Sequence, residues 1–274
     1  MRCYLSVDME GIAGIAHPAQ CSFEAGGDRT DYDRGRLLMA GEANAAITAA
    51  FDAGADEVLV NDSHWQMRNL RAEDVDPRAR LIIGDKPYSM TQAVEGADAA
   101  AFIGYHAGAG HATGIIGHTY AGVVWQARVN GVPHNETGLN ALRLGHHGVP
   151  VVMVAGDDAL AGEVEELLPW AERVVVKRAI SPFAADSLSP DAARSAVADG
   201  LRRGLQNPDR MQPYRLDGPL ELEIDLRLSA MADYCAVMPG VERSGPRSVV
   251  ARPADAEELY RYMIAIVRMA SIPG

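Results

Sequence analysis

The chain has 274 residues, of which 48% are apolar and 23% are charged, and this usage excludes a disordered chain. The formal net charge of −12 argues against the basic face of a nucleic-acid-binding protein. No apolar run reaches the roughly 18–20 residues that cross a bilayer. Asp8 and Glu10 stand where the apolar core of a secretory signal would continue. We therefore expect a cytoplasmic protein with no nucleic-acid or membrane partner.

The first part of the chain alternates strand-like with helix-like segments. Short, almost continuously apolar runs predict buried strands, and apolar residues at three- and four-residue steps predict a helix over 31–53. Such alternation predicts a mostly parallel sheet flanked by helices, a three-layer α/β fold. The other predicted segments are strands over 2–7, 57–60, 79–84, 97–105, 149–156 and 173–179, and helices over 90–96, 137–146 and 158–168.

Later segments have a different pattern. Asn130-Gly131 separates two strand-like runs and predicts a tight hairpin. After about residue 180, apolar and polar residues alternate as in a half-exposed strand. We expect a metal-binding catalytic α/β domain over 1–180 and a smaller C-terminal α+β domain over 181–274. The segments predicted for the smaller domain are a helix near 190–205, strands over 220–227 and 247–253, and an amphipathic helix over 255–271.

Asp8 and Glu10 follow the first predicted strand. Residues two apart on a strand point to the same face, with their stems about 6–7 Å apart, so the two carboxylates converge. Like charges so close repel each other, and a divalent cation between them removes that repulsion. The alternative interpretation is a solvated strand end, because paired carboxylates are common on protein surfaces.

Further nitrogen and oxygen ligands follow other predicted strands. His64 and His106 each come after a strand, and Glu136 lies just past the hairpin. Because ligands bind beyond the carboxyl ends of parallel strands, we expect these residues at the same edge of the sheet as Asp8 and Glu10. The set contains no thiolate, which argues against a closed structural zinc site. Five ligands suit two metal ions with a shared carboxylate.

His118 lies in a Gly-rich loop after His106. A loop can hold an imidazole close to the metal site without coordinating a metal, which suits a general acid–base or a group that stabilises an oxyanion. The alternative is a loop histidine without a role, and His111 in the same loop is a weaker candidate. The remaining histidines are expected to be structural or exposed.

Several catalytic motifs are missing. GxSxG is absent, which argues against a serine hydrolase. GxxxxGK[ST], HExxH and a GxGxxG following a strand are absent too, which argues against a nucleotide-binding module despite the α/β pattern.

Four motifs resemble those of the DppA-type zinc D-aminopeptidase family. The segment VVMVAGDD over 151–158 is similar as well, and the resemblance runs from residue 1 to about 190, continuing more faintly to the C-terminus. In chain order the motifs are Ser6-Val7-Asp8-Met9-Glu10-Gly11, Asn61-Asp62-Ser63-His64, Gly104-Tyr105-His106 and Asn135-Glu136-Thr137-Gly138-Leu139-Asn140.

The resemblance implies a self-compartmentalising peptidase with two Zn²⁺ per chain, although Mn²⁺ or Co²⁺ would suit the same ligand types. It also implies a homodecamer and a catalytic role for His118. Carried over position by position, the implied metal ligands are Asp8, which bridges the two ions, Glu10, His64, His106 and Glu136.

The sequence thus predicts a binuclear-zinc aminopeptidase that removes an N-terminal D-amino acid or glycine from short peptides. One alternative is a related metal-dependent amidohydrolase that acts on a non-peptide amide. The other is a peptide-binding protein without catalytic activity.

Overall fold

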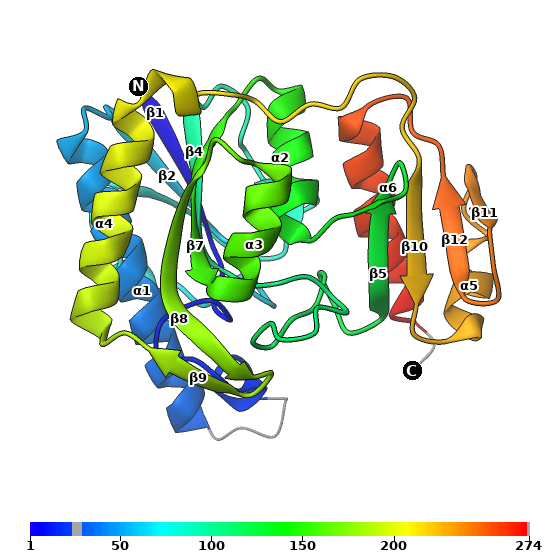
Figure 1. Ribbon diagram of the computed structural model, residues 1–274, viewed down its shortest axis with the longest axis horizontal. Helices are drawn as coiled ribbons and strands as arrows, with labels where there is room; N and C mark the ends of the chain where they lie inside the picture. The colour runs from blue at the N-terminus through cyan, green and yellow to red at the C-terminus, as the bar shows by residue number, and fades with distance from the viewer. Residues whose placement is uncertain (24–28, 273–274) are drawn as a thin grey trace.

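The computed structural model describes residues 1–23 and 29–272. Its core is a seven-stranded sheet in the order β3-β2-β1-β4-β7-β8-β9, in which β9 is antiparallel to β8 and every other neighbouring pair is parallel. The predicted α/β fold with a mostly parallel sheet is confirmed (Figure 1). The strands are β1 (Arg2–Val7), β2 (Glu57–Asp62), β3 (Arg80–Ile82), β4 (Ala99–Tyr105), β7 (Val151–Asp157), β8 (Glu172–Ser181) and β9 (Ala184–Ser187).

Helices cover both faces of this sheet. Helices α1 (Arg29–Asp52) and α4 (Pro190–Gln206) pack on each other and on one face. Helices α2 (Glu136–His146) and α3 (Asp158–Leu167) lie in front of β4, β7 and β8 on the other face (Figure 1). The central strands β4 and β7 are buried along their whole length, which explains their continuous apolar sequences.

The strand order reverses between β1 and β4. The chain goes from β1 outward to β2 and β3, and then returns to β4 on the other side of β1. In such sheets the loops that leave the two strands at the reversal diverge, and the crevice between them binds ligands. The loops after β1 and β4 are the ones that carry Asp8, Glu10 and His106.

A smaller antiparallel sheet stands beside the first (Figure 1). Its order is β11-β12-β10-β5-β6. The predicted hairpin is confirmed, since Asn130 and Gly131 join β5 to β6 with φ of 50° and 79°, as a type I′ turn requires. The elements of this module are β5 (Val124–Val129), β6 (Val132–Pro133), β10 (Leu222–Leu226), β11 (Val241–Arg243), β12 (Ser248–Ala251), α5 (Ser229–Cys235) and α6 (Ala256–Ala270).

Helix α2 belongs to both parts of the molecule. Leu139 and Leu142 pack in the core of the smaller sheet, whereas Ala141 and Leu144 pack against the larger sheet. Arg143, which is fully buried, pairs with Glu95 at 2.6 Å and, on α6, with Glu257 at 2.9 Å. Glu136, the first residue of α2, therefore stands on an element that both cores hold.

The elements cross the expected boundary at residue 180. Strands β5 and β6 precede it but belong to the smaller sheet, and β9 and α4 follow it but pack with the larger one. The division into domains over 1–180 and 181–274 remains a prediction.

The short helix predicted over 90–96 is wrong. The chain makes only a 3-10 turn over Ser89–Thr91, because Gln92 is extended and Ala93 and Gly96 have positive φ. Further 3-10 turns lie over Pro18–Gln20, Ala72–Asp74 and Pro208–Arg210.

Within the described residues, the longest apolar stretches of helix are too short or too polar to cross a membrane.

Candidate metal centre

Asp8 and Glu10 lie in a turn that begins where β1 ends, at Val7. They converge because of this turn and not, as the sequence suggested, because of alternation along a strand. The amides of Asp8 and Gly11 donate hydrogen bonds of 2.8 Å to Ile103 and Gly104 of β4. At Gly11 an added Cβ would lie 1.8 Å from the carbonyl oxygen of Tyr105, so only glycine permits this approach.

His64 follows β2 on a loop whose backbone donates hydrogen bonds to the Asp62 side chain. The buried Asp62 carboxylate accepts hydrogen bonds from the amides of Asn69 at 2.5 Å and Leu70 at 2.7 Å. The Nε2 atom of His64 lies 2.8 Å from the carbonyl oxygen of Cys21. A carbonyl only accepts, so Nε2 carries a proton and Nδ1 of the neutral ring is free as a ligand.

Asp8, Glu10 and His64 form the first group of potential ligands. His64 Nδ1 lies 3.2 Å from Asp8 Oδ1 and 2.9 Å from Glu10 Oε2. All three residues are at most 5% exposed. The predicted convergence of these residues is therefore present in the structure.

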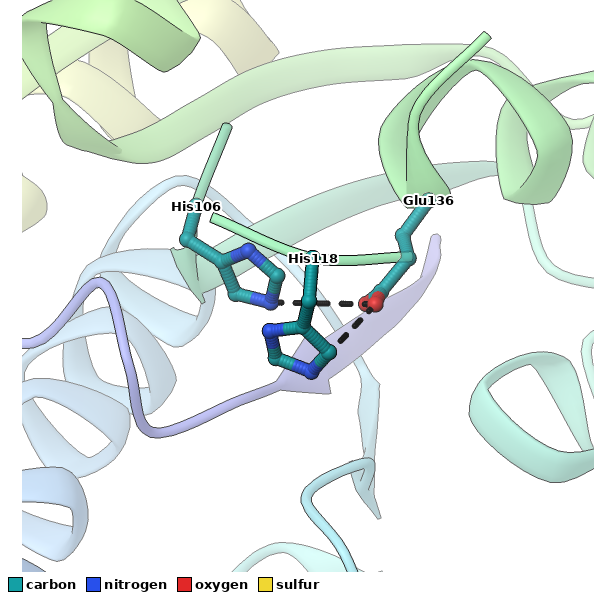
Figure 2. A group of neighbouring side chains, drawn as sticks. All are labelled: His106, His118 and Glu136. Carbon is teal, nitrogen blue, oxygen red and sulfur yellow. Dashed lines mark ion pairs between the residues drawn. The ribbon is translucent and has the colours of Figure 1, made fainter. Parts of the chain in front are cut away.

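His106, His118 and Glu136 form the second group (Figure 2). The Oε1 atom of Glu136 lies 3.7 Å from His106 Nε2 and 3.9 Å from His118 Nε2. The same oxygen accepts a 2.6 Å hydrogen bond from the amide of Tyr120. His106 donates from Nδ1 to the carbonyl of Ala107 at 3.0 Å, which leaves Nε2 as the free nitrogen.

Asp8 connects the two groups. Its Oδ1 faces His64 of the first group, and its Oδ2 lies 3.4 Å from His106 Nε2 of the second. One carboxylate therefore directs one oxygen toward each group. This is the arrangement that a ligand shared between two metal ions requires.

The negative electrostatic potential of the buried carboxylates favours cations at the site. Burial by itself would lower the pKa of His106, but Glu136 and Asp8 outweigh it and raise that pKa to about 10. The pKa of His64 is likewise well above its ordinary value, since Glu10 and Asp8 overcome the opposing effect of burial. Without metal, protons on these rings balance the buried carboxylates, and a divalent cation can take over that balance.

Two buried atoms at the site fit a bound ion. Among the described residues, His106 Nε2 and Glu10 Oε2 make no hydrogen bond of good geometry, and their nearest polar partners are the Asp8 carboxylate at 3.4 Å and the His64 ring at 2.9 Å. Buried polar atoms rarely stay unpaired, and an unpaired atom in such a place calls for a water or an ion. Imidazole and carboxylate donors suit Zn²⁺, Mn²⁺ or Co²⁺, so the residues present fit a divalent metal.

His118 is the most accessible member of the second group. Its side chain is 30% exposed, and its ring stacks on that of His106 with the centroids 4.2 Å apart. Its Nδ1 is 2.9 Å from the carbonyl of Ile116, which leaves Nε2 directed to Glu136. Ile116 has a φ of 52°, a strained conformation for a β-branched residue. The loop thus directs His118 Nε2 toward the other members of the second group.

The other histidines have different partners. His111 Nδ1 accepts hydrogen bonds from the amides of Thr113 and Gly114 and belongs to neither group. His134 bonds to the Tyr214 hydroxyl at 3.0 Å. His17 caps the turn over Pro18–Gln20, and His147 pairs with Glu257 at 3.1 Å.

A cavity of about 440 Å³ opens onto both groups. Asp8, Glu10 and Glu136 line it together with Ile264 and Val267 of α6. A small molecule in the cavity would therefore contact residues of both parts of the molecule.

Sequence reasoning missed two buried ionisable residues that hold the Glu10 loop. Lys177 of β8 donates to the carbonyls of Glu10, Ile12 at 3.1 Å and Ile15 at 2.5 Å, and burial lowers its pKa to about 8. Glu42 of α1 accepts from the amide of Ala13 at 2.9 Å. Lys177 could have been found from the sequence, because it interrupts the apolar run RVVVKRA and a charged residue in a buried strand needs partners.

The protein is a three-layer α/β protein with a candidate metal centre. Its two clusters of histidine and carboxylate side chains lie where the strand order of the larger sheet reverses. The sequence profile of the peptidase M55 family, described as D-aminopeptidase, matches residues 1–265. The D-aminopeptidase of Bacillus subtilis (strain 168) is 41% identical over 276 residues, which cover 98% of either chain.

A solved structure agrees with this match. The "Zn-dependent D-aminopeptidase DppA from Bacillus subtilis, a self-compartmentalizing protease" superposes with a TM-score of 0.94 and 38% identity, covering 100% of this chain and 99% of that one. The chain belongs to the peptidase M55 family of D-aminopeptidases, so it is a hydrolase of the metallo-aminopeptidase class. The resemblance found in the sequence is confirmed.

Proposed function

We propose that this protein binds two Zn²⁺ per chain and uses them to remove an N-terminal D-amino acid or glycine from short peptides. The observation that carries the proposal is the Asp8 carboxylate, which directs one oxygen to His64 and the other to His106. In this proposal Asp8 would be a ligand of both ions. Glu10 and His64 would complete the ligands of one ion, and His106 and Glu136 those of the other.

A pair of divalent ions supplies an activated water at neutral pH and polarises a carbonyl group. The protein's own contribution is orientation and proton transfer. We assign His118 as the catalytic residue, because its Nε2 is free, its side chain is partly exposed and it lines the cavity. From that position it can stabilise the developing oxyanion or pass a proton to the leaving amine.

The substrate class rests on the names of the relatives, which are D-aminopeptidases. A cavity of about 440 Å³ is in the range of small-ligand sites and supports short peptides over folded proteins.

Metal analysis together with peptide hydrolysis tests the function. We expect two zinc ions per chain, and cleavage of dipeptides with N-terminal D-Ala or Gly in preference to L-Ala. Cleavage of non-peptide amides alone would favour an amidohydrolase. Tight binding of D-Ala dipeptides without turnover by the zinc-loaded protein would instead favour a binding protein.

The oligomeric state and the cellular location are proposals as well. The solved relative is a self-compartmentalizing protease, which supports a homo-oligomer here, and we propose a cytoplasmic homodecamer. Light scattering on the purified protein should give a mass near ten times 29.3 kDa. An active monomer would refute this assembly.

A further inference from the structure

Glu163 lies on α3, outside both groups of potential ligands, yet it touches two segments that carry members of the second group. Its Oε2 accepts a hydrogen bond of 3.0 Å from the amide of Gly108 and one of 2.7 Å from the side-chain amide of Asn135. Gly108 is two residues after His106, and Asn135 immediately precedes Glu136. One carboxylate therefore links the loop after β4 to the start of α2.

The contact with Gly108 reaches the His106 ring through one peptide group. The N–H of the Ala107–Gly108 peptide donates to Glu163, and the carbonyl of the same peptide accepts from His106 Nδ1 at 3.0 Å. A carboxylate on the N–H polarises the peptide and strengthens the hydrogen bond that its carbonyl accepts. This fixes the ring with Nε2 directed to Asp8 and Glu136.

The contact with Asn135 reaches Glu136 through the helix start. Asn135 is the N-cap of α2, and its Oδ1 accepts a 2.9 Å hydrogen bond from the amide of Gly138. Its Nδ2 donates to Glu163, so both ends of the amide are used. The cap therefore has one orientation, and it sets the position of Glu136, the first residue of the helix.

The two contacted segments lie unusually close together. A Cβ added at Gly108 would stand 2.9 Å from the Cβ of Asn135. The glycine lets the loop and the helix start approach until a single carboxylate can bind both. Burial raises the pKa of Glu163 above its ordinary value, while the hydrogen bonds from Gly108 and Asn135 favour the charged form.

We propose that Glu163 is a positioning residue of the metal centre, which orients His106 through the Ala107–Gly108 peptide and Glu136 through Asn135. The proposal rests on the proposed function in one respect, that His106 and Glu136 bind the same ion. Partners of ligating histidines typically contribute roughly 10–100-fold to metal affinity, and Glu163 would act in this way on one ion only.

The main test is zinc titration of the metal-free protein against a competing chelator. Glu163→Gln removes the charge at constant size and should weaken binding of one of the two ions about 10–100-fold, leaving the other unchanged. The matched control is Glu166→Gln, because Glu166 is on the same helix as Glu163 and is exposed. We expect wild-type zinc affinities for this control.

Hydrogen exchange of the metal-free protein separates the proposed role of Glu163 from the proposed zinc-dependent function. The amide of Gly108 should exchange hydrogen faster in metal-free Glu163→Gln than in the metal-free wild type, while Glu166→Gln leaves it unchanged. Glu163→Asp, which keeps the charge, should recover part of the zinc affinity.

Two results would overturn the inference. One is wild-type affinity for both ions in Glu163→Gln, and the other is an equal loss in Glu166→Gln. If the wild type binds no metal but Gly108 exchange responds to Glu163→Gln, the proposed metal function fails while the hydrogen-bond relay stands.

Discussion

The two groups of the candidate metal centre differ in how they meet solvent. Asp8, Glu10 and His64 are at most 5% exposed and lie on turns that the larger sheet holds. The second group includes His118, whose side chain is 30% exposed and which comes from the loop between the two sheets. Both groups line the cavity, but only the second contains a partly exposed side chain, that of His118.

This difference assigns different tasks to the two groups. In the first group, buried ionisable side chains hold the Glu10 loop, Lys177 on β8 and Glu42 on α1. The second is held by a loop, a helix N-terminus and Glu163, and one of its imidazoles faces the cavity. We therefore expect the first group to bind its ion more tightly and the second to stand nearer to the chemistry.

The largest effect should come from Asp8→Ala, which removes the residue that links the groups. Both ions should be weakened, and hydrolysis should fall by more than about 10³-fold, because several kcal/mol of metal-based stabilisation are lost. Zinc content and kcat/KM measure this. Full occupancy of both sites in this variant would show that Asp8 does not bridge them.

His118→Ala should lower kcat by roughly 10²–10⁴-fold while KM changes little, as expected for a group that acts mainly in the transition state. The variant should keep two zinc ions, whereas His106→Ala should lose one. His111→Ala is the control in the same loop and should keep wild-type activity. Loss of an ion in His118→Ala would make His118 a ligand of the second group.

Lys177→Met should affect the first group and the stability of the whole chain. Three carbonyls of the Glu10 loop would lose their donor, at a cost of about 3–5 kcal/mol in the free energy of unfolding. Urea unfolding of the metal-free protein measures the loss. Zinc titration should show that the tighter ion is the one weakened, and selective weakening of the other ion would contradict the comparison.

Glu42→Gln should change the pH dependence of stability. Burial raises the pKa of Glu42 to about 7 from an ordinary value of 4.5. A raised pKa in the folded state stabilises the protein below pH 4.5, and this contribution is lost as the pH rises through 7. As the pH rises from 4.5 to 8, the free energy of unfolding of the variant should therefore increase by about 2–3 kcal/mol relative to that of the wild type.

Urea unfolding of the metal-free proteins at several pH values checks the Glu42 prediction. Glu73→Gln, at an exposed site, is the control and should follow the wild type. A constant difference between Glu42→Gln and the wild type at all pH values would show that Glu42 does not titrate in this range.

Local sequence patterns determined much of the fold and nominated the six residues of the two groups, although not the residues that hold them in place. Apolar runs revealed the buried strands because both faces of a parallel sheet are covered. Asp8, His64 and His106 stood out because polar side chains that follow buried strands meet at one edge of the sheet. The turn at Asn130-Gly131 could be predicted because its φ angles depend on those two residues alone.

Tertiary structure decided how these residues meet. The turn after Val7 brings Asp8 and Glu10 together through hydrogen bonds to β4, a partner nearly a hundred positions away in the sequence. Glu163, Lys177 and Glu42 act on the site from α3, β8 and α1, and no spacing rule joins them to the ligands. Local patterns record which face of an element is buried, whereas these contacts depend on which elements pack side by side, and only the folded chain establishes that.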